Sequence, residues 1–412
     1  MSDNSAANSL PEWLTDAFME GHLRNYYKNN DIKLIRFDVK SGAGKDEGFM
    51  SSMLRTTVKY SVPGEDDDKT INLIIKVPVS EETVDTFANY DVYNREIEFY
   101  GDIAPKIGQK LKELGEVQLL PESIGVCKTR KIMIMEDLGA KGYGVLPAQP
   151  GYNIAQTKAI LKRMATLHAI SAVLQEENPN IFTNFKSGHF SRDVDVYNHM
   201  YAGNFDALLE TISTWPEFSM YTEKLRRTRE DVVERWRRIY DVNPNHFNTL
   251  IHDDFWPPNI MLKINNPTEE QPLENVVFID FQMTFWSSPT IDLYFFLNTS
   301  VCESFRPHRF DELVEYYHQY LVQFLQRLGY KKHIPTWPEF QEQYQERKLM
   351  AFITSCLEQP ITIDNNGELG VDVLLKNDET AKNAKRTLYQ KEKVQLILRK
   401  MIPYYDQIGT FD

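Results

Sequence analysis

The sequence predicts an α+β fold with two lobes: a five-stranded antiparallel sheet with one helix, followed by a mainly helical C-terminal lobe. Short β-branched and aromatic runs are concentrated before residue 138. Long segments with helical spacing of apolar residues dominate after the Gly- and Pro-containing crossover 139–151. We therefore expect a tail and helix over 1–30, an N-lobe over 31–138 and a C-lobe over 139–412.

In the N-lobe, an amphipathic helix with Trp13, Leu14, Phe18 and Leu23 at helical spacings follows a polar tail. A helical segment over Val92–Ile103 should end before Pro105, because the residue before a proline disfavours helical geometry. The five strands are expected at Ile32–Val39, Leu54–Val62, Thr70–Val77, Ser123–Cys127 and Ile132–Met135.

In the C-lobe, one strand-rich stretch interrupts the helices, and it brackets residues 252–281. The apolar run ending in NVVFIDF is typical of a buried strand that delivers one acid, Asp280, to a site. Helices are expected at Ile154–Gln175, Thr222–Tyr240, Phe310–Leu328 and Glu379–Met401.

Composition limits the classes of function. With 46 basic and 59 acidic residues the chain carries a formal charge of −13, so a broad nucleic-acid or anionic-membrane surface is not expected. Three cysteines without ligand spacing indicate a reducing compartment. The N-terminal residues form no signal peptide and no run is long enough to span a membrane, so we expect a cytoplasmic protein. No obligate protein partner is evident from the sequence.

The most informative motif is His252, Asp254 and Asn259, followed downstream by Asp280. Phosphoryl transfer needs a carboxylate that orients the attacking hydroxyl, and a second carboxylate with an amide that hold Mg²⁺ against the phosphates. Asn259 lies five residues after Asp254, which is the spacing of the kinase catalytic loop. The motif therefore predicts a phosphotransferase with Asp254 as the catalytic carboxylate and Asn259 and Asp280 as metal ligands.

Lys76 and Glu96 are the candidate phosphate-binding pair of the N-lobe. Lys76 ends the apolar run INLIIK, where an ammonium would need an anion, and Glu96 lies on the following helix, from which it can hold the lysine. The alternative is that Lys76 extends to solvent from a strand end and Glu96 is a solvated helix residue.

Two further stretches are candidates for nucleotide contacts. The loop SGAGKDEGFMS contains Gly44 and could place backbone N–H groups over phosphates, although it lacks the usual GxGxxG spacing and also suits an ordinary hairpin loop. The strand IMIMEDL, with Glu136 and Leu138, could offer backbone groups to adenine. The acidic side chains Glu136 and Asp137 could instead cap the next turn.

Together these stretches resemble the insect ecdysteroid kinase-like (CHK kinase-like) family, which is related to choline kinases and aminoglycoside phosphotransferases. The resemblance covers nearly the whole chain and implies a protein-kinase-like fold with ATP and Mg²⁺ as cofactors. The matching segments are PEWL, GAGKDEGFMSSMLR, LIIKV, REIEFY, IMEDLG, LHAISA, HDDFWPPNIM, FIDFQ and SSPTIDLYFFL.

The resemblance assigns the roles given above to Asp254, Asn259, Asp280, Lys76 and Glu96. It also makes Asp292 a brace for the catalytic loop, where the residues alone leave helix capping open. His252 is a further residue of the catalytic site, which we expect to orient the loop by hydrogen bonds, with proton transfer as the alternative. The family usually has Gly between His252 and Asp254, whereas this chain has Asp253. This second acid could raise the pKa of Asp254 or bind another cation.

The expected acceptor is a small hydroxylated molecule. The resemblance implies an ecdysteroid or a lipophilic xenobiotic alcohol. A choline- or ethanolamine-type kinase and a catalytically silent small-molecule carrier with the same fold are the alternatives. Aromatic residues make up 12% of the chain, and most of those near residues 281–296 and 316–320 suit a packed core, with the remainder available for an apolar acceptor pocket.

Overall fold

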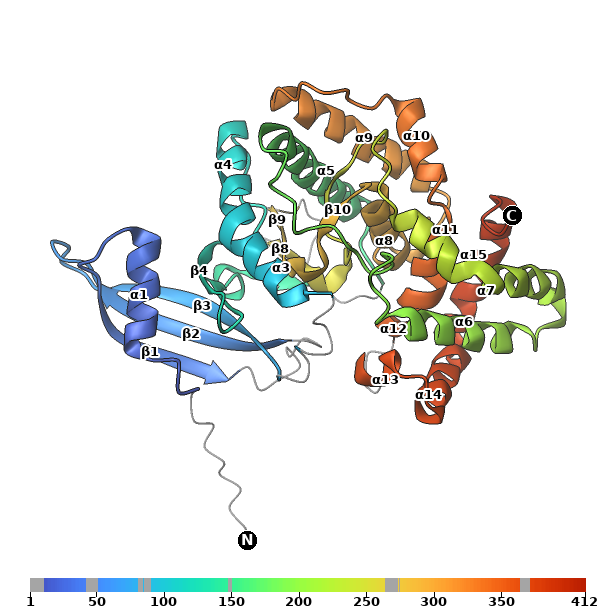
Figure 1. The fold of residues 1–412 in the computed structure, drawn as a ribbon, viewed down its shortest axis with the longest axis horizontal. Helices are drawn as coiled ribbons and strands as arrows, with labels where there is room; N and C mark the ends of the chain where they lie inside the picture. Colours follow the sequence, from blue (N-terminus) through green and yellow to red (C-terminus); the bar gives the residue numbers. More distant parts are fainter. Residues whose placement is uncertain are drawn as a thin grey trace, which may run out of the picture. The chain divides into compact units, whose positions relative to one another are not determined.

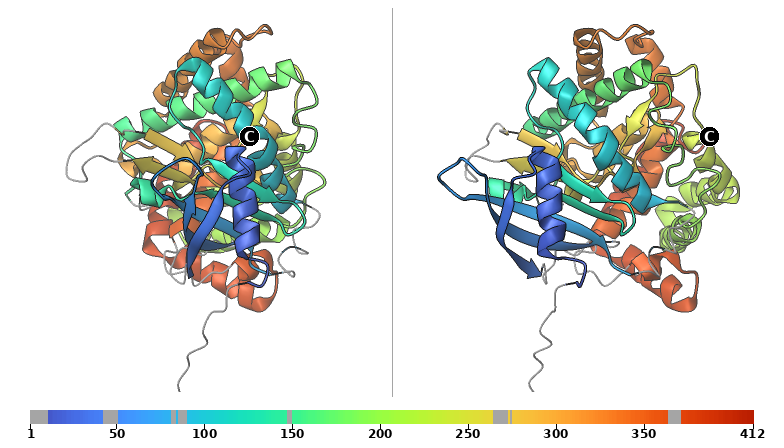
Figure 2. Two further views of the ribbon diagram at one scale, coloured as in Figure 1. Left: turned by 90° about the vertical axis from the view of Figure 1, so that its left-hand side faces the viewer. Right: turned by 60° about the vertical axis from the view of Figure 1, so that its left-hand side comes forward.

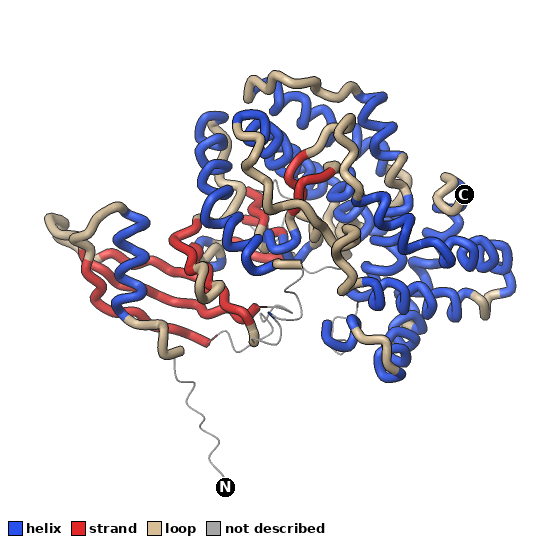
Figure 3. Tube along the Cα trace, in the orientation of Figure 1, coloured by secondary structure: helices blue, strands red, loops and turns tan. Residues whose placement is uncertain are grey.

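The chain folds into two compact units. Unit 1 comprises Met1–Gly108 and Leu120–Gly144, and unit 2 comprises Gln109–Leu119 and Val145–Asp412. Strands dominate unit 1 and helices dominate unit 2 (Figure 3). This computed structural model describes residues 11–41, 51–80, 84, 90–146, 150–263, 273, 275–363 and 371–412.

Unit 1 is built on the predicted five-stranded antiparallel sheet, with strand order β1-β2-β3-β5-β4. Helix α1 (Asp16–Tyr27) lies on one face of this sheet, where Met19 and Leu23 are fully buried (Figures 1 and 2). The Thr15 side chain caps this helix by accepting a hydrogen bond from the N–H of Phe18. The strands are β1 (Lys33–Ser41), β2 (Ser51–Ser61), β3 (Lys69–Pro78), β4 (Ser123–Cys127) and β5 (Ile132–Glu136).

The helix expected to end before Pro105 continues past it. Helix α3 (Val92–Glu98) runs through the π-helical segment η1 (Phe99–Ile103) into α4 (Ala104–Leu114). In η1 the N–H of Ala104 reaches back to the carbonyl of Phe99, so a new α-helical register begins at Ala104. Pro105 then falls in the first turn of α4, where a missing N–H is tolerated.

The strands of unit 2 form two short pairs that flank the predicted catalytic loop. Strand β7 (Thr249–Ile251) pairs with β10 (Phe285–Ser287), and β8 (Ile260–Lys263) pairs with β9 (Asn275–Phe278). All four residues of β9 are buried, as the apolar run NVVF predicts. The short strand β6 (Tyr143–Val145) precedes the helical part of the chain.

Helices make up the rest of unit 2. Three of the four predicted helices are present, and each of their ends lies within three residues of the predicted position. The segment predicted as one helix over 379–401 forms two helices, because Lys391 between them has extended backbone geometry. The helices are α5 (Ile154–Glu177), α6 (Asn198–Ile212), α7 (Ser219–Tyr240), α8 (Thr290–Thr299), α9 (Phe310–Arg327), α10 (Trp337–Gln345), α11 (Leu349–Phe352), α12 (Gln359–Ile363), α13 (Val371–Leu375), α14 (Glu379–Gln390) and α15 (Glu392–Gln407), with shorter segments η2 (Gly139–Lys141), η3 (Pro216–Phe218), η4 (Pro257–Asn259), η5 (Phe281–Met283), η6 (Glu303–Phe305) and η7 (Ile353–Glu358).

Helix α8 lies at the centre of the core of unit 2, since every one of its residues is buried. The aromatic residues near it, including Phe281 and Phe285, are 0–5% exposed and therefore belong to the packed core. Trp286 is half-buried and stacks on Phe182. None of the helices in the described part of the chain has the length and apolar composition that crossing a membrane requires.

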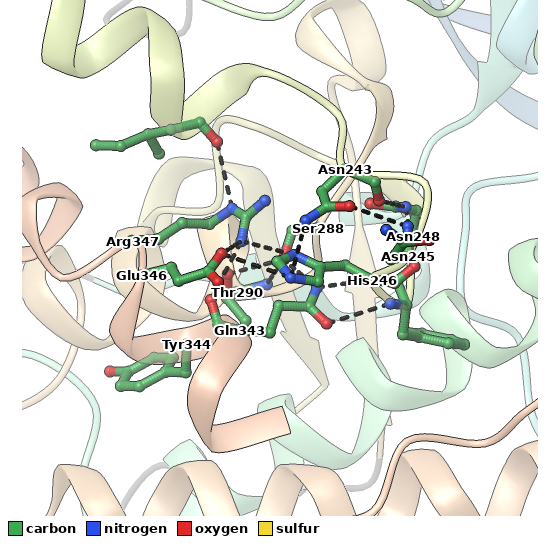
Figure 4. Close-up of polar contacts among 12 residues, drawn as sticks. Asn243, Asn245, His246, Asn248, Ser288, Thr290, Gln343, Tyr344, Glu346 and Arg347 are labelled. Atoms are coloured by element: carbon green, nitrogen blue, oxygen red, sulfur yellow. Dashed lines mark hydrogen bonds and ion pairs between the residues drawn. The ribbon is translucent and has the colours of Figure 1, made fainter. Parts of the chain in front are cut away.

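A buried polar network fixes one end of the β7–β10 pair, where β7 begins and β10 ends (Figure 4). The amide of Gln343 donates to the carbonyl of Phe247, which precedes β7, and to the hydroxyl of Ser288, which follows β10. The buried guanidinium of Arg347 donates to the carbonyls of Gln343 and Ile239. Helix α10 thus holds the strand pair from which the catalytic loop emerges.

Candidate active site

The backbone of the catalytic loop is held by the carboxylate of Asp292, on α8. The N–H of His252 donates to Oδ2 of Asp292 at 2.8 Å, and the N–H of Asp253 donates to Oδ1 at 2.9 Å. Nε2 of His168 lies 3.1 Å from the same Oδ2. Asp292 is fully buried, and α8 has no side-chain cap. Its contacts are those of a brace for the loop, not of a helix cap.

His252 connects the catalytic loop to the end of β9. Its Nε2 lies 2.9 Å from the carbonyl of Ile279, the residue before Asp280. Burial lowers the pKa of His252 despite the charges of the nearby acids, so the ring is neutral at pH 7 and Nε2 carries the donated proton. These contacts fit a residue that orients the loop.

Asp254 and Asn259 are in direct contact. The Asn259 amide donates to the Asp254 carboxylate oxygen Oδ2 at 2.8 Å and to the Asp254 carbonyl at 3.0 Å. Both amide protons of Asn259 are therefore directed at Asp254. The two residues predicted from their spacing form one unit.

Asp280 reaches the same end of the β8–β9 pair as Asn259. Ile260 pairs with Phe278 in these strands, and the N–H of Ile279 donates to the carbonyl of Asn259 at 3.0 Å. Asp280 adopts a left-handed backbone conformation, with φ at 66°, which turns the chain immediately after the strand. Its charge is among the causes that raise the pKa of Asp254, so the two carboxylates interact.

The carboxyl group of Asp254 is less acidic than an ordinary aspartate. Burial is the main cause that raises its pKa to about 7; Asp280 and Asp253 add to the rise, while His189 and the Asn259 amide oppose it. An ordinary aspartate has a pKa near 4. The difference arises because the loop packs into the core of unit 2.

Asp253, at the position where the resemblance implies glycine, is accommodated inside the protein. It is 0% exposed and has a φ of 61°, a region in which Asp is less costly than most residues. The Tyr240 hydroxyl donates to its Oδ1 at 2.6 Å, while the N–H and Nδ1 of His189 lie 3.0 and 2.9 Å from its Oδ2. Its carboxylate is thus bound by side chains of this chain.

His189 and Tyr240 were not predicted from the sequence. Neither has a motif, and they lie 64 and 13 residues before Asp253. The one local signal is Gly188, where an added Cβ would lie 2.6 Å from the Asp253 carboxylate and 2.2 Å from the Phe285 ring. That glycine is required by the close approach of its backbone to the acid.

In unit 1, Lys76 and Glu96 form a buried ion pair. Nζ of Lys76 lies 2.8 and 2.7 Å from the two carboxylate oxygens of Glu96, and the residues are 3% and 1% exposed. These values exclude the alternative of a solvent-directed lysine and a solvated glutamate. The pairing of Lys76 with Met53 on β2 and Met133 on β5 places it on a central strand of the sheet.

The side chains at the end of β5 serve the structure of unit 1. Glu136 accepts from the Glu122 N–H at 2.8 Å and also binds Lys141, while Asp137 accepts from the Gly139 N–H at 2.9 Å and pairs with Arg55. The capping alternative therefore holds for Asp137. Adenine contacts by the backbone of Glu136 and Leu138 stay a prediction, and Gly44 lies outside the described residues.

Comparison with known proteins gives one family and several distant structures. Residues 45–330 match the ecdysteroid kinase-like family. Among solved structures, a type I macrolide 2'-phosphotransferase shares 15% identity over 92% of this chain and 99% of its own, with a TM-score of 0.35. A Plasmodium vivax ethanolamine kinase shares 14% identity over 88% of this chain and 83% of its own, with a TM-score of 0.39. The choline kinase LicA from Streptococcus pneumoniae shares 10% identity over 93% of this chain and 98% of its own, with a TM-score of 0.38. No curated protein sequence matches the chain.

The buried pair in unit 1 gives a stability prediction. Glu96→Gln keeps the shape of the side chain but leaves the Lys76 ammonium buried without its counter-charge, which should lower the free energy of unfolding by about 3–5 kcal/mol. Urea denaturation measures this value. The matched control is the double variant Lys76→Met with Glu96→Gln, which removes both charges and should recover most of the loss. If the single variant is as stable as the wild type, the pair contributes nothing.

The Asp253 network gives a pH-dependent prediction. Burial by itself would lower the pKa of His189, but the charge and hydrogen bond of Asp253 outweigh it and raise that pKa. The resulting stability is fully present below the unfolded pKa of about 6.5 and is lost as pH rises through the folded pKa. Asp253 also raises the pKa values of Asp254 and Glu358, which acts in the same direction.

The stability advantage of the wild type over Asp253→Asn should therefore be largest near pH 6 and decrease toward pH 9, with a total on the order of 1–3 kcal/mol. Denaturant titrations at several pH values give the difference. Tyr240→Phe is the control, because it removes one hydrogen bond to Asp253 without removing the charge. An advantage over Asp253→Asn that does not vary with pH would contradict the ion pair.

Proposed function

Because the chain belongs to the ecdysteroid kinase-like family, we propose that it transfers a phosphoryl group from ATP, with Mg²⁺, to a hydroxyl of a small molecule. An ecdysteroid or a lipophilic xenobiotic alcohol is the proposed acceptor. The observation that supports the chemistry most strongly is the contact of the Asp254 carboxylate with Asn259, next to Asp280 at the end of the β8–β9 pair. An orienting carboxylate and oxygen ligands for a divalent ion are the parts that phosphoryl transfer requires.

Asp254 is proposed to orient the acceptor hydroxyl. Its pKa, about 7, is still far below that of an alcohol, so it cannot remove the proton before the reaction begins. The proton instead passes to Asp254 as the bond from oxygen to phosphorus forms. A carboxyl group with a pKa near neutrality accepts that proton more readily than an ordinary aspartate would.

The residues at the end of the β8–β9 pair suit Mg²⁺. The side-chain oxygen of Asn259 and the carboxylate of Asp280 would hold the ion, whose charge neutralises that of the phosphates. The described residues contain no group of three or more His, Cys, Asp or Glu side chains that could hold a metal by themselves. Nucleotide phosphates would complete the coordination, because Mg²⁺ is usually bound by one or two carboxylates together with phosphates.

In unit 1, Lys76 is proposed to bind the phosphates of ATP while Glu96 fixes the direction of its ammonium group. The backbone at Glu136 and Leu138 is the proposed contact for adenine. The N–H groups of Glu136 and Asp137 cannot serve there, because they donate to the carbonyls of Glu122 at 3.0 Å and Asn72 at 2.9 Å.

Substitution of Asp254 and substitution of Asp280 should cause different kinetic defects. Asp254→Ala should lower kcat by about 10²–10⁴-fold with little change in ATP affinity, because it removes orientation and proton acceptance. Asp280→Ala should instead weaken the binding of Mg-ATP. Phosphorylated product is measured by mass after incubation with Mg-ATP and a panel of hydroxylated steroids, choline and ethanolamine.

Each outcome of that assay distinguishes the candidate functions. Product from steroids supports the proposed acceptor class, whereas product from choline or ethanolamine alone supports the choline-kinase alternative. Near-wild-type turnover by Asp254→Ala would refute its catalytic role. A wild-type protein that binds a steroid but yields no product from any acceptor would be a silent carrier.

A further inference from the structure

Glu358 is a buried carboxylate that the proposed reaction does not use. It ends η7, the π-helical segment between α11 and α12, and is 7% exposed. π-Helical turns are found frequently at functional sites. Here the turn comes shortly before Pro360, whose missing N–H prevents an ordinary helical hydrogen bond.

Side chains from other helices take the carbonyls that this turn exposes. The Tyr389 hydroxyl donates to the carbonyl of Cys356 at 2.8 Å, and the Asn204 amide donates to that of Leu357 at 2.9 Å. The wide turn is thus fixed from two sides by α14 and α6. Its consequence is that Glu358 lies inside the protein, where an acid is costly.

Only one oxygen of the Glu358 carboxylate is bonded. Oε1 accepts from the Tyr201 hydroxyl, whereas Oε2 is buried and has no hydrogen-bond partner in the part of the chain that the structure describes. An ionised carboxylate would leave an acceptor unused there, and a protonated one would leave a donor unused. Either state carries a desolvation cost that a partner would remove.

Glu358 belongs to the same buried cluster as the catalytic loop. The Phe190 ring lies 4.4 Å from that of Tyr201, which binds Glu358, and 5.2 Å from that of Tyr240, which binds Asp253. The charges interact as well. Burial is the main cause that raises the pKa of Glu358 to about 7, His189 opposes the rise, and Asp254 adds to it.

A role limited to holding Tyr201 does not account for this arrangement. The hydrogen bond from the Tyr201 hydroxyl needs only one acceptor oxygen, which a neutral side chain could supply. It does not explain why residue 358 has a second oxygen or why its charge lies close to Asp254. Tyr201 is also packed against Phe190 and Trp236, so its ring position does not depend on the carboxylate alone.

We propose that Glu358 is an acceptor-binding residue, whose Oε2 receives a hydrogen bond from a second hydroxyl of the acceptor, separate from the one that is phosphorylated. This inference rests on the proposed function and narrows it, because it requires an acceptor with at least two hydroxyl groups. A buried polar group that loses its partner discriminates strongly against an analogue without that hydroxyl.

The test compares acceptors and variants together. The acceptors are 20-hydroxyecdysone and analogues that each lack one hydroxyl. The variants are wild type, Glu358→Met, which removes both carboxylate oxygens, and Tyr201→Phe, with Glu315→Met as a control at an exposed position of α9. The measured quantity is the ratio of kcat/KM for the full acceptor to kcat/KM for each analogue that is still phosphorylated.

For one such analogue the wild-type ratio should be at least about tenfold. Glu358→Met should bring this ratio close to one, because it leaves no oxygen to accept from the second hydroxyl, while Tyr201→Phe and Glu315→Met should keep it. If Tyr201→Phe abolishes the preference as Glu358→Met does, or if Glu358→Met keeps it, Glu358 has only a structural role.

The failure of this inference differs from that of the proposed function. An active wild type with an unchanged preference in Glu358→Met rejects only the role of Glu358. If the wild type forms no product, calorimetric binding of the same steroids without nucleotide replaces the kinetic ratio. Steroids that neither bind nor react would reject both proposals.

Discussion

The candidate active site depends on one buried carboxylate that accepts hydrogen bonds from the backbone of its loop. Asp292 receives two N–H groups of the catalytic loop and contacts His168, and without these donors its charge would be costly in the core. Hydrogen bonds to an ionised group are stronger than neutral ones, so the loop is fixed more firmly than a turn of the same length would be. Asp254 and Asn259 take their positions from this constraint.

A second acid beside the catalytic one is tolerated for a related reason. Asp253 occupies a position whose backbone geometry suits glycine, yet its carboxylate has two partners of its own, His189 and Tyr240. The negative charge therefore has a counter-charge inside the protein. The charge of Asp253 also acts on Asp254, whose pKa it helps to raise.

Short sequence patterns predicted those parts of the fold and of the candidate site whose residues lie close together in the chain. The alternating and apolar runs gave the five-stranded sheet and β9, and the spacing of Asp254 and Asn259 gave a pair that is in contact. Lys76 and Glu96 were found because a lysine in an apolar strand needs an anion. Family resemblance supplied the role of Asp292.

Contacts without a local pattern could not be predicted. His189 contacts Asp253, and the charge of Glu358 interacts with that of Asp254. Both residues come from segments far from the loop in the sequence, and neither lies at a spacing that marks it. The π-helical segments η1 and η7 were also missed, because proline normally ends a helix and only the surrounding side chains make a wider turn possible.

The most direct test of the central claim is hydrogen–deuterium exchange in the wild type and in Asp292→Asn, measured by mass spectrometry. The account predicts that exchange in a peptide spanning Ile251–Asp254 rises at least about tenfold in the variant while α5 keeps its protection, and that turnover falls in parallel. Unchanged protection of that peptide in the variant would contradict the claim that Asp292 fixes the loop.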